Sequence, residues 1–82
     1  MTDQELDVCI LRLAQDEGCD ALRLIYDEMH RPVYLYALSM LKDKYTAEDV
    51  AQDVFVQVAV SAPRTFRAQG KPRSWIFAIA HN

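Results

Sequence analysis

The sequence lacks several features that would place the protein in a secreted, membrane or disulfide-stabilised class. Its 82 residues include only two cysteines, Cys9 and Cys19, which form no Cys-x-x-Cys pair and are expected to be reduced thiols. No apolar run approaches the ~20 residues that a membrane-spanning helix needs. The acidic start, residues 1–7, has neither the basic nor the apolar region of a secretion signal. We therefore expect a cytoplasmic protein without a membrane span.

The groups that typify an active site are also missing. No nucleophile stands beside a base, and no cluster has the spacing of metal ligands. Asp49 and Asp53 lie one helical turn apart and could share a cation, but no third ligand is near them in the sequence. His30 and His81 stand alone, and a lone histidine on a helix is usually structural. The sequence predicts a protein that is not an enzyme and that has no cofactor or metal.

Acidic residues are absent from the last third of the chain. Residues 1–53 hold all twelve acids and five basic residues, a net charge of −7, whereas residues 54–82 hold four basic residues and no acid, a net charge of +4. The average charge of −3 would argue against nucleic-acid binding, but the local potential depends on this distribution. The second segment is therefore a candidate anion-binding surface.

What the sequence does contain is helical periodicity. The 51% hydrophobic content supports a core, and the length suits one small domain. No alternating strand pattern or internal repeat is present. The sequence predicts an all-α fold, a compact bundle of about four helices, with helices over residues 3–16, 20–41, 46–62 and from 72 to the end.

Caps and prolines predict where these helices begin, bend and end. Thr2 and Glu5 form a capping box at the first helix, and Gly18 can close it. Pro32 predicts a kink or break near residues 28–32 of the second helix. Thr46 is expected to cap the third helix and Pro63 to stop it. Pro72 suits the first turn of the last helix.

The second helix is expected to have one buried side. Asp27, Glu28 and Arg31 are expected to point away from this side. The residues expected to be buried are Leu22, Ile25, Met29, Val33, Tyr36, Ala37 and Met40.

The third helix has two distinct faces. Its buried stripe is expected to comprise Ala47, Val50, Ala51, Val54, Phe55, Val58 and Ala59. Opposite this stripe, one line holds Asp49, Gln52, Asp53, Val56 and Val60. This line could be an ordinary solvated face or be covered by another helix. Apolar side chains aligned with acids favour a different interpretation, a docking surface for a partner with an apolar patch and a basic rim.

The basic segment after the third helix combines cations with aromatic rings. Guanidinium and ammonium groups bind phosphates, and ring faces stack on unpaired bases, which is the combination that single-stranded nucleic acid requires. On composition alone the alternative stays open that the rings belong to the core and the basic groups are simply solvated. The residues concerned are Arg64, Phe66, Arg67, Lys71, Arg73 and Trp75.

Three motifs in this order resemble a known family. AEDVAQDVF, then a spacer ending in a Phe-Arg loop, then SWIFAIAHN resemble the second conserved region of bacterial RNA polymerase sigma factors of the extracytoplasmic-function (ECF) group. The resemblance extends back through DALRLIYDEMHRPVYLYALSML and so covers nearly the whole chain, residues 1–82, as one region 2 domain. Each motif alone is weak, and their order and spacing together are specific.

The resemblance implies two binding surfaces. The face with Asp49, Gln52, Asp53 and Val56 would dock on the clamp helices of the polymerase β′ subunit. The loop at 64–74 and the last helix would open and read the −10 promoter element on the non-template strand, with an extruded base held by the loop. An anti-sigma factor is a further expected partner. The DNA-binding residues expected on this basis are Arg64, Phe66, Arg67, Lys71, Arg73, Ser74, Trp75, His81 and Asn82.

The sequence departs from the family pattern at three points. Ala78 stands where relatives commonly carry arginine, and Pro72 alters the loop that would hold an extruded base. The helix-turn-helix domain that binds the −35 element in this family is absent from the chain. The rival hypothesis is a small helical interaction module, such as an anti-sigma-binding fragment, that has no nucleic-acid role.

Overall fold

The described part of the chain is helical. The computed structural model describes residues 1–15 and 20–81, and within them there is no strand. These residues form four helices, α1 (Asp3–Ala14), α2 (Asp20–Leu41), α3 (Lys44–Thr65) and α4 (Pro72–His81). The all-α prediction is confirmed.

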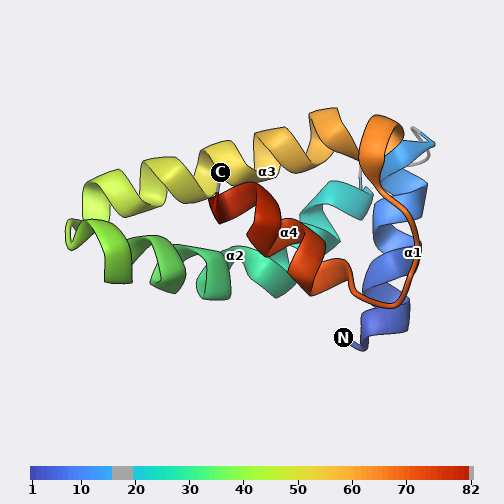
Figure 1. The fold of residues 1–82 in the computed structure, drawn as a ribbon, viewed down its shortest axis with the longest axis horizontal. Coiled ribbons are helices and arrows are strands. Elements are labelled where there is room, and N and C mark those ends of the chain that lie inside the picture. Colours follow the sequence, from blue (N-terminus) through green and yellow to red (C-terminus); the bar gives the residue numbers. More distant parts are fainter. Residues whose placement is uncertain (16–19, 82) are drawn as a thin grey trace.

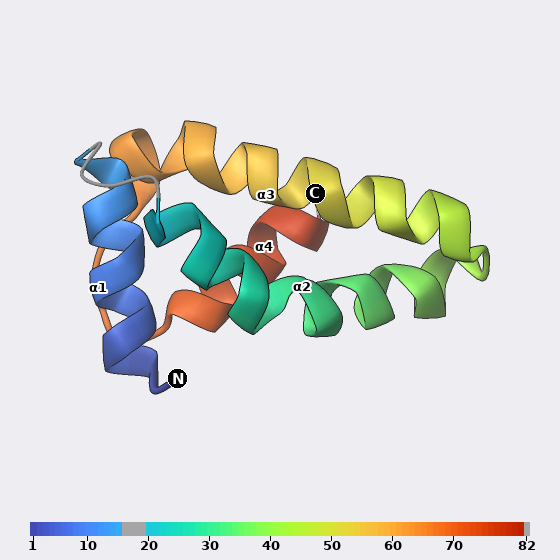
Figure 2. The ribbon, with the colours of Figure 1, turned by 180° about the vertical axis from the view of Figure 1, so that it is seen from behind.

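The two long helices form the frame of the domain. α2 and α3 run antiparallel as a hairpin, and α1 stands across one end of it (Figure 1). α4 packs against one side of this hairpin, in front of it in Figure 1 and behind it in the reversed view of Figure 2. The opposite side of the hairpin is therefore left uncovered by α4.

All four helices contribute to one core. The side chains that are almost completely buried include Leu6, Ile10, Ile25, Met29, Val33, Val58 and Ile76. Cys9 is a buried free thiol beside them, and Cys19 lies outside the described residues. The buried stripe expected on α3 is confirmed, since its members are buried or half-buried. The core draws apolar side chains from all four helices, and their burial is the main source of stability in a domain of this size.

The start of α1 follows the sequence prediction. The Thr2 side chain accepts from the Glu5 amide at 3.1 Å, and the Glu5 carboxylate accepts from the Thr2 amide at 2.9 Å. This capping box satisfies two donors that the first turn leaves free. The bond to the Thr2 amide lowers the pKa of Glu5. The helix is capped at its end by Gln15, and the expected role of Gly18 falls outside the described residues.

Helix α2 bends at its proline and does not break. It is continuous through Pro32, and its axis changes direction midway, as both views show (Figures 1 and 2). Proline removes one backbone hydrogen bond, and the neighbouring turns hold the helix together on either side. Two assignments to its faces were wrong. Met40 is 61% exposed, and Glu28 is half-buried because it pairs with Arg73 of α4.

Helix α3 is longer at both ends than predicted. Asp43, not Thr46, is its N-cap, and the Asp43 carboxylate accepts from the Thr46 amide at 3.3 Å and from the Thr46 hydroxyl. The chain turns from α2 through Lys42, a residue with φ of 57°, which brings Asp43 into the capping position. Pro63 does not stop the helix, because its fixed φ is itself helical and the helix ends only where Phe66 becomes extended.

Candidate functional site

The outward face of α3 is exposed as the sequence predicted. Its acids, Asp49 and Asp53, lie at the surface, and Val56 and Val60 are 57% and 53% exposed. They are displayed because the opposite face of the same helix is fixed in the core. The face therefore combines negative charge with exposed apolar surface. Within the described residues no other helix covers it.

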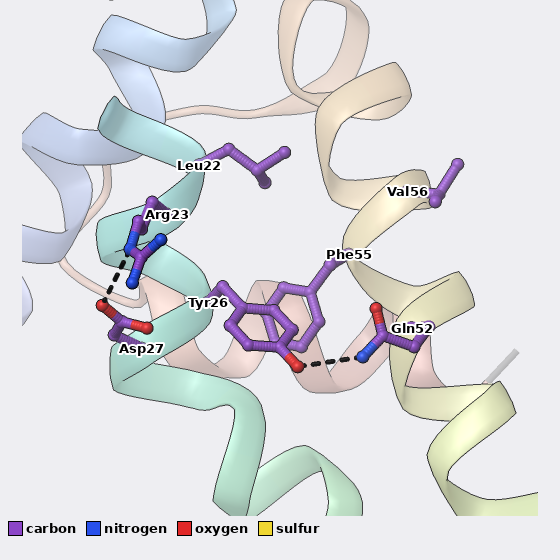
Figure 3. Close-up of a pocket in the computed structure, with 7 residues that line it drawn as sticks. All are labelled: Leu22, Arg23, Tyr26, Asp27, Gln52, Phe55 and Val56. Atoms are coloured by element: carbon purple, nitrogen blue, oxygen red, sulfur yellow. Dashed lines mark hydrogen bonds and ion pairs between the residues drawn. The ribbon is translucent and has the colours of Figure 1, made fainter. Parts of the chain in front are cut away.

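An open hollow adjoins this face, between α2 and α3. It measures about 480 Å³ and is lined by Leu22, Arg23, Tyr26, Asp27, Gln52, Phe55 and Val56. Figure 3 looks into it with α4 behind, so the hollow opens on the side of the hairpin that faces away from α4. The four residues from α2 were not expected here. Arg23 and Asp27 lie one turn apart in the sequence, a spacing that favours an ion pair on one face of α2. In the structure they form an exposed ion pair at 3.8 Å.

A chain of polar contacts crosses from α2 to α3 beside the hollow. Gln52 donates from its amide to the Tyr26 hydroxyl and to the Glu48 carboxylate, both at 2.9 Å, and the first bond is drawn in Figure 3. His30 Nε2 lies 2.8 Å from the same Glu48 oxygen, Oε1. The hydrogen bond from Gln52, and then that from His30, lower the pKa of Glu48. Gln52 is thus held in place by Tyr26 and Glu48, and Glu48 in turn is held by His30.

His30 is therefore not the lone histidine that the sequence suggested. Its ring stacks on Tyr26 with 4.7 Å between centroids and faces Tyr34 at 6.0 Å. His81 also has a partner, since its Nδ1 lies 2.9 Å from the Tyr36 hydroxyl. Neither contact could be predicted from the sequence, because the partners lie far away along the chain. Both histidines connect α2 to another helix.

Three of the basic side chains lie at the surface around the α3–α4 connection. Arg64 is in the last turn of α3, and Arg67 and Lys71 are in the loop that follows. Arg67 donates to the carbonyl of Phe66 at 3.0 Å, which leaves most of its guanidinium donors exposed. Ser74 and His81 are exposed on α4, while Asn82 lies outside the described residues. The structure thus brings these three cations together at one connection.

Arg73 is not a free phosphate ligand in this structure. Its guanidinium donates to Asp3 at 3.0 Å, to Glu28 at 2.9 Å and to the Met1 carbonyl at 2.7 Å. The hydrogen bond to Glu28 raises the pKa of Arg73 most, although burial opposes it. Arg73 therefore joins the start of α4 to α1 and α2. These pairs could not be predicted from the sequence, because the acidic partners lie about 45 and 70 residues earlier in the chain.

The aromatic residues of this segment belong at least partly to the core. Phe66 is only 5% exposed and meets Trp75 edge-on, with 4.9 Å between ring centroids. Trp75 is half-buried and keeps part of its ring at the surface. The alternative in which these rings are core residues therefore holds for Phe66. A base could stack on Phe66 only after the loop rearranged.

The described residues contain no candidate metal site. In residues 1–15 and 20–81, no three His, Cys, Asp or Glu side chains lie close enough together to hold a metal ion. Asp49 and Asp53 accordingly gain no third ligand from another helix. No helix of the described chain has the length and apolarity to span a membrane.

The chain is similar to known sigma factors. The family described as Sigma-70 region 2 matches residues 25–82. The ECF RNA polymerase sigma factor SigK of Mycobacterium sp. (strain KMS) is 32% identical over 77 residues, which are 94% of this chain and 39% of the relative. In Bacillus subtilis (strain 168), the ECF RNA polymerase sigma factor SigX is 30% identical over 63 residues, 77% of this chain and 32% of the relative.

A third relative, the ECF RNA polymerase sigma factor SigM of Bacillus subtilis (strain 168), is 36% identical over 58 residues, 71% of this chain and 34% of the relative. The chain thus spans about a third to two-fifths of the length of these relatives. No solved structure matches it. Because the family match covers most of α2 and all of α3 and α4, the chain belongs to the Sigma-70 region 2 family, in the group of ECF sigma factors.

Proposed function

We propose that residues 1–82 are the promoter-recognition and promoter-opening domain of an ECF sigma factor, acting by binding and not by catalysis. The α3 face with Asp49, Gln52, Asp53 and Val56 docks on the clamp helices of the polymerase β′ subunit. The α3–α4 loop and α4 then hold the non-template strand of the −10 element. A cytoplasmic location follows from this role, and an anti-sigma factor is a further proposed partner on the family resemblance.

The observation that carries the proposal is the position of two different surfaces on the α2–α3 hairpin. The α3 face and its adjoining hollow open away from α4, and they combine two acids with exposed valine and a fixed amide. Such a surface is complementary to a partner with an apolar centre and a basic rim. Because α4 packs on the other side, a partner docked in the hollow would leave α4 accessible.

The DNA side of the proposal relies on charge. Arg64, Arg67 and Lys71 are exposed around one connection, and no acid occurs after Asp53 in the sequence. Exposed cations on a short loop suit the backbone of a single strand. The exposed part of Trp75 adds a ring surface on which a base can stack.

The experiment separates the two surfaces with two double variants. Asp49→Lys with Asp53→Lys reverses charge on the exposed face only, so the domain should stay helical and lose binding to core polymerase in a pull-down. Arg67→Ala with Lys71→Ala should keep core binding and lose promoter opening. Opening is measured by permanganate footprinting, with residues 1–82 followed by a −35-binding domain. Circular dichroism checks the fold of each variant.

A single-site pair controls for net charge. Asp53→Lys and Asp20→Lys make the same change in charge, but Asp20 begins α2 and lies outside the docking face. Only Asp53→Lys should weaken core binding. If the double lysine variant binds core polymerase as the wild type does, the α3 face is an ordinary solvated surface. If the wild-type chain binds neither core polymerase nor, in its presence, a promoter-like single strand, the rival interaction module without a nucleic-acid role is favoured.

A further inference from the structure

The loop that carries Arg67 and Lys71 lies along α1. It leaves α3 at Phe66, passes beside α1 and enters α4 at Pro72, as Figures 1 and 2 both show. The family match begins at residue 25, so α1 lies outside the matched segment. The matched family therefore assigns no role to the helix against which this loop rests.

One side chain of α1 holds this loop at its middle. The Asp7 carboxylate accepts a hydrogen bond through Oδ2 from the backbone amide of Gly70, at 3.0 Å. Asp7 is only 8% exposed, whereas Gly70 is at the surface. The bond joins residues 63 positions apart and is part of no helix. It therefore restrains the loop without adding to the helices themselves.

Gly70 has the backbone conformation that this contact needs. Its φ of 77° lies in the left-handed region, which residues with a side chain rarely adopt, and the space around its Cα is open. The chain bends there, and its amide meets the carboxylate. Glycine at this position is thus explained by the bend, not by crowding.

The other oxygen of Asp7 makes the residue unusual. Oδ1 is buried and has no hydrogen-bond partner among the described residues. A buried carboxylate with one unpaired oxygen lowers the stability of the fold. A neutral side chain at this position would pack in the core at least as well. A role outside core packing explains its presence better.

We propose that Asp7 is a positioning residue for DNA binding, which holds the 66–71 loop in the shape that presents Arg67 and Lys71 to the single strand. The inference rests on the proposed function and extends it to α1. A loop that is ordered before binding loses less conformational entropy when the strand arrives. Arg73 supports the same arrangement from the far end of the loop through Asp3 of α1.

The first test measures the contact itself. Hydrogen exchange of the Gly70 amide is followed by NMR in the wild type, in Asp7→Asn, which keeps an acceptor oxygen, and in Asp7→Ala, which has none. We expect slow exchange in the first two proteins and at least tenfold faster exchange in Asp7→Ala, with the Ile76 amide in α4 unchanged. Equal exchange of the Gly70 amide in all three proteins would overturn the proposal, whatever their DNA binding.

The second test measures strand binding by fluorescence anisotropy, with a short labelled single-stranded DNA and each protein bound to core polymerase. Asp7→Asn and Asp7→Ala remove the same charge, which by itself would strengthen DNA binding in both. We expect Asp7→Ala to bind about three- to tenfold more weakly than Asp7→Asn, as when a short loop must be ordered on binding. Thermal melts should show Asp7→Ala to be as stable as Asp7→Asn to within a few degrees.

A third variant acts on the other end of the contact. Gly70→Ala disfavours the left-handed bend, so it should weaken strand binding as Asp7→Ala does, and the double variant should be no worse than either single one. Additive losses would contradict a shared contact.

The variant of the two loop cations separates this inference from the proposed function. If Arg67→Ala with Lys71→Ala leaves strand binding unchanged, the proposed function itself fails. If that variant loses binding while Asp7→Ala does not, only the role of Asp7 is refuted.

Discussion

At the scale of single residues, the four cations that follow Asp53 divide into two kinds. Arg64, Arg67 and Lys71 are exposed, whereas the guanidinium of Arg73 already donates to two carboxylates and a backbone carbonyl. A phosphate could reach Arg73 only by displacing Asp3 or Glu28. The charge available to DNA in the folded domain is therefore carried mainly by three side chains.

This division predicts different stability effects for two arginines. Arg73→Ala should lower the free energy of unfolding by about 1–2 kcal/mol, because it leaves two carboxylates unpaired at a partly solvated site. Arg67→Ala should change it by less than about 0.5 kcal/mol, as is usual at exposed positions. Urea denaturation of both variants measures this. Equal stabilities would show that the bonds of Arg73 contribute nothing to folding.

Phe55 offers a test of the core assignment on α3. It is 4% exposed and meets Tyr26 edge-on at 5.0 Å, so Phe55→Ala should cost about 3–5 kcal/mol, a large part of the stability of a domain this small. Val56→Ala, its exposed neighbour, is the control and should have little effect. A Phe55→Ala protein that melts within a degree or two of the wild type would show that the α3 faces are wrongly assigned.

At the scale of the helices, the ends and contacts of α1 and α3 depend on ionised carboxylates. Hydrogen bonds from Thr2 lower the pKa of Glu5, and those from Thr46 lower that of Asp43. The pKa of Glu48, which joins α3 to α2 through His30, is lowered by the hydrogen bond from Gln52 and then by that from His30. Each group has a lower pKa folded than unfolded. Its stabilising contribution is therefore complete above the ordinary value and lost as the pH falls through the folded value.

A pH titration of thermal stability should show this loss. The ordinary values are 4.5 for glutamate and 3.8 for aspartate, so the melting temperature should fall as the pH drops below that range. Glu48→Gln cannot be protonated there, and its melting temperature should fall less steeply than that of the wild type. Circular dichroism melts in small pH steps supply the measurement. A variant with an unchanged slope would mean that the Glu48 contacts do not stabilise the folded state.

Local sequence signals predicted some helix ends well and others poorly. The capping box at Thr2 was predictable because both of its bonds lie within one turn. The start of α3 was not, because Asp43 and Thr46 are both good caps and the turn at Lys42 decides between them. Pro63 does not end α3, since its fixed φ is compatible with a helix and the helix continues to Thr65.

At the scale of the whole molecule, the sequence predicted the composition of each surface but not how the surfaces are built. The exposed line on α3 followed from helical periodicity alone. The contribution of α2 to the hollow, the partners of His30 and the bonds of Arg73 all join residues far apart in the chain. No local pattern can specify such contacts before the packing of α1, α2 and α4 is known.

The whole-molecule prediction concerns DNA binding by the free domain. Its net charge is −3, and the three exposed cations release few counterions, so the logarithm of its affinity for a single strand should fall with the logarithm of salt concentration with a slope of only about −2. Fluorescence anisotropy at several salt concentrations gives this slope. In Arg67→Ala with Lys71→Ala the slope should be shallower than about −1, since each lost phosphate contact reduces its magnitude by about 0.7.

Core polymerase should supply the affinity that the free domain lacks. Docking through the α3 face would hold the loop and α4 beside the opened strand and raise their effective concentration there. Strand binding should therefore strengthen greatly when core polymerase is added to the wild type, and not when it is added to Asp49→Lys with Asp53→Lys. Tight, salt-insensitive binding of duplex DNA by the isolated domain would contradict this account, because the three exposed cations after Asp53 cannot produce it on an acidic protein.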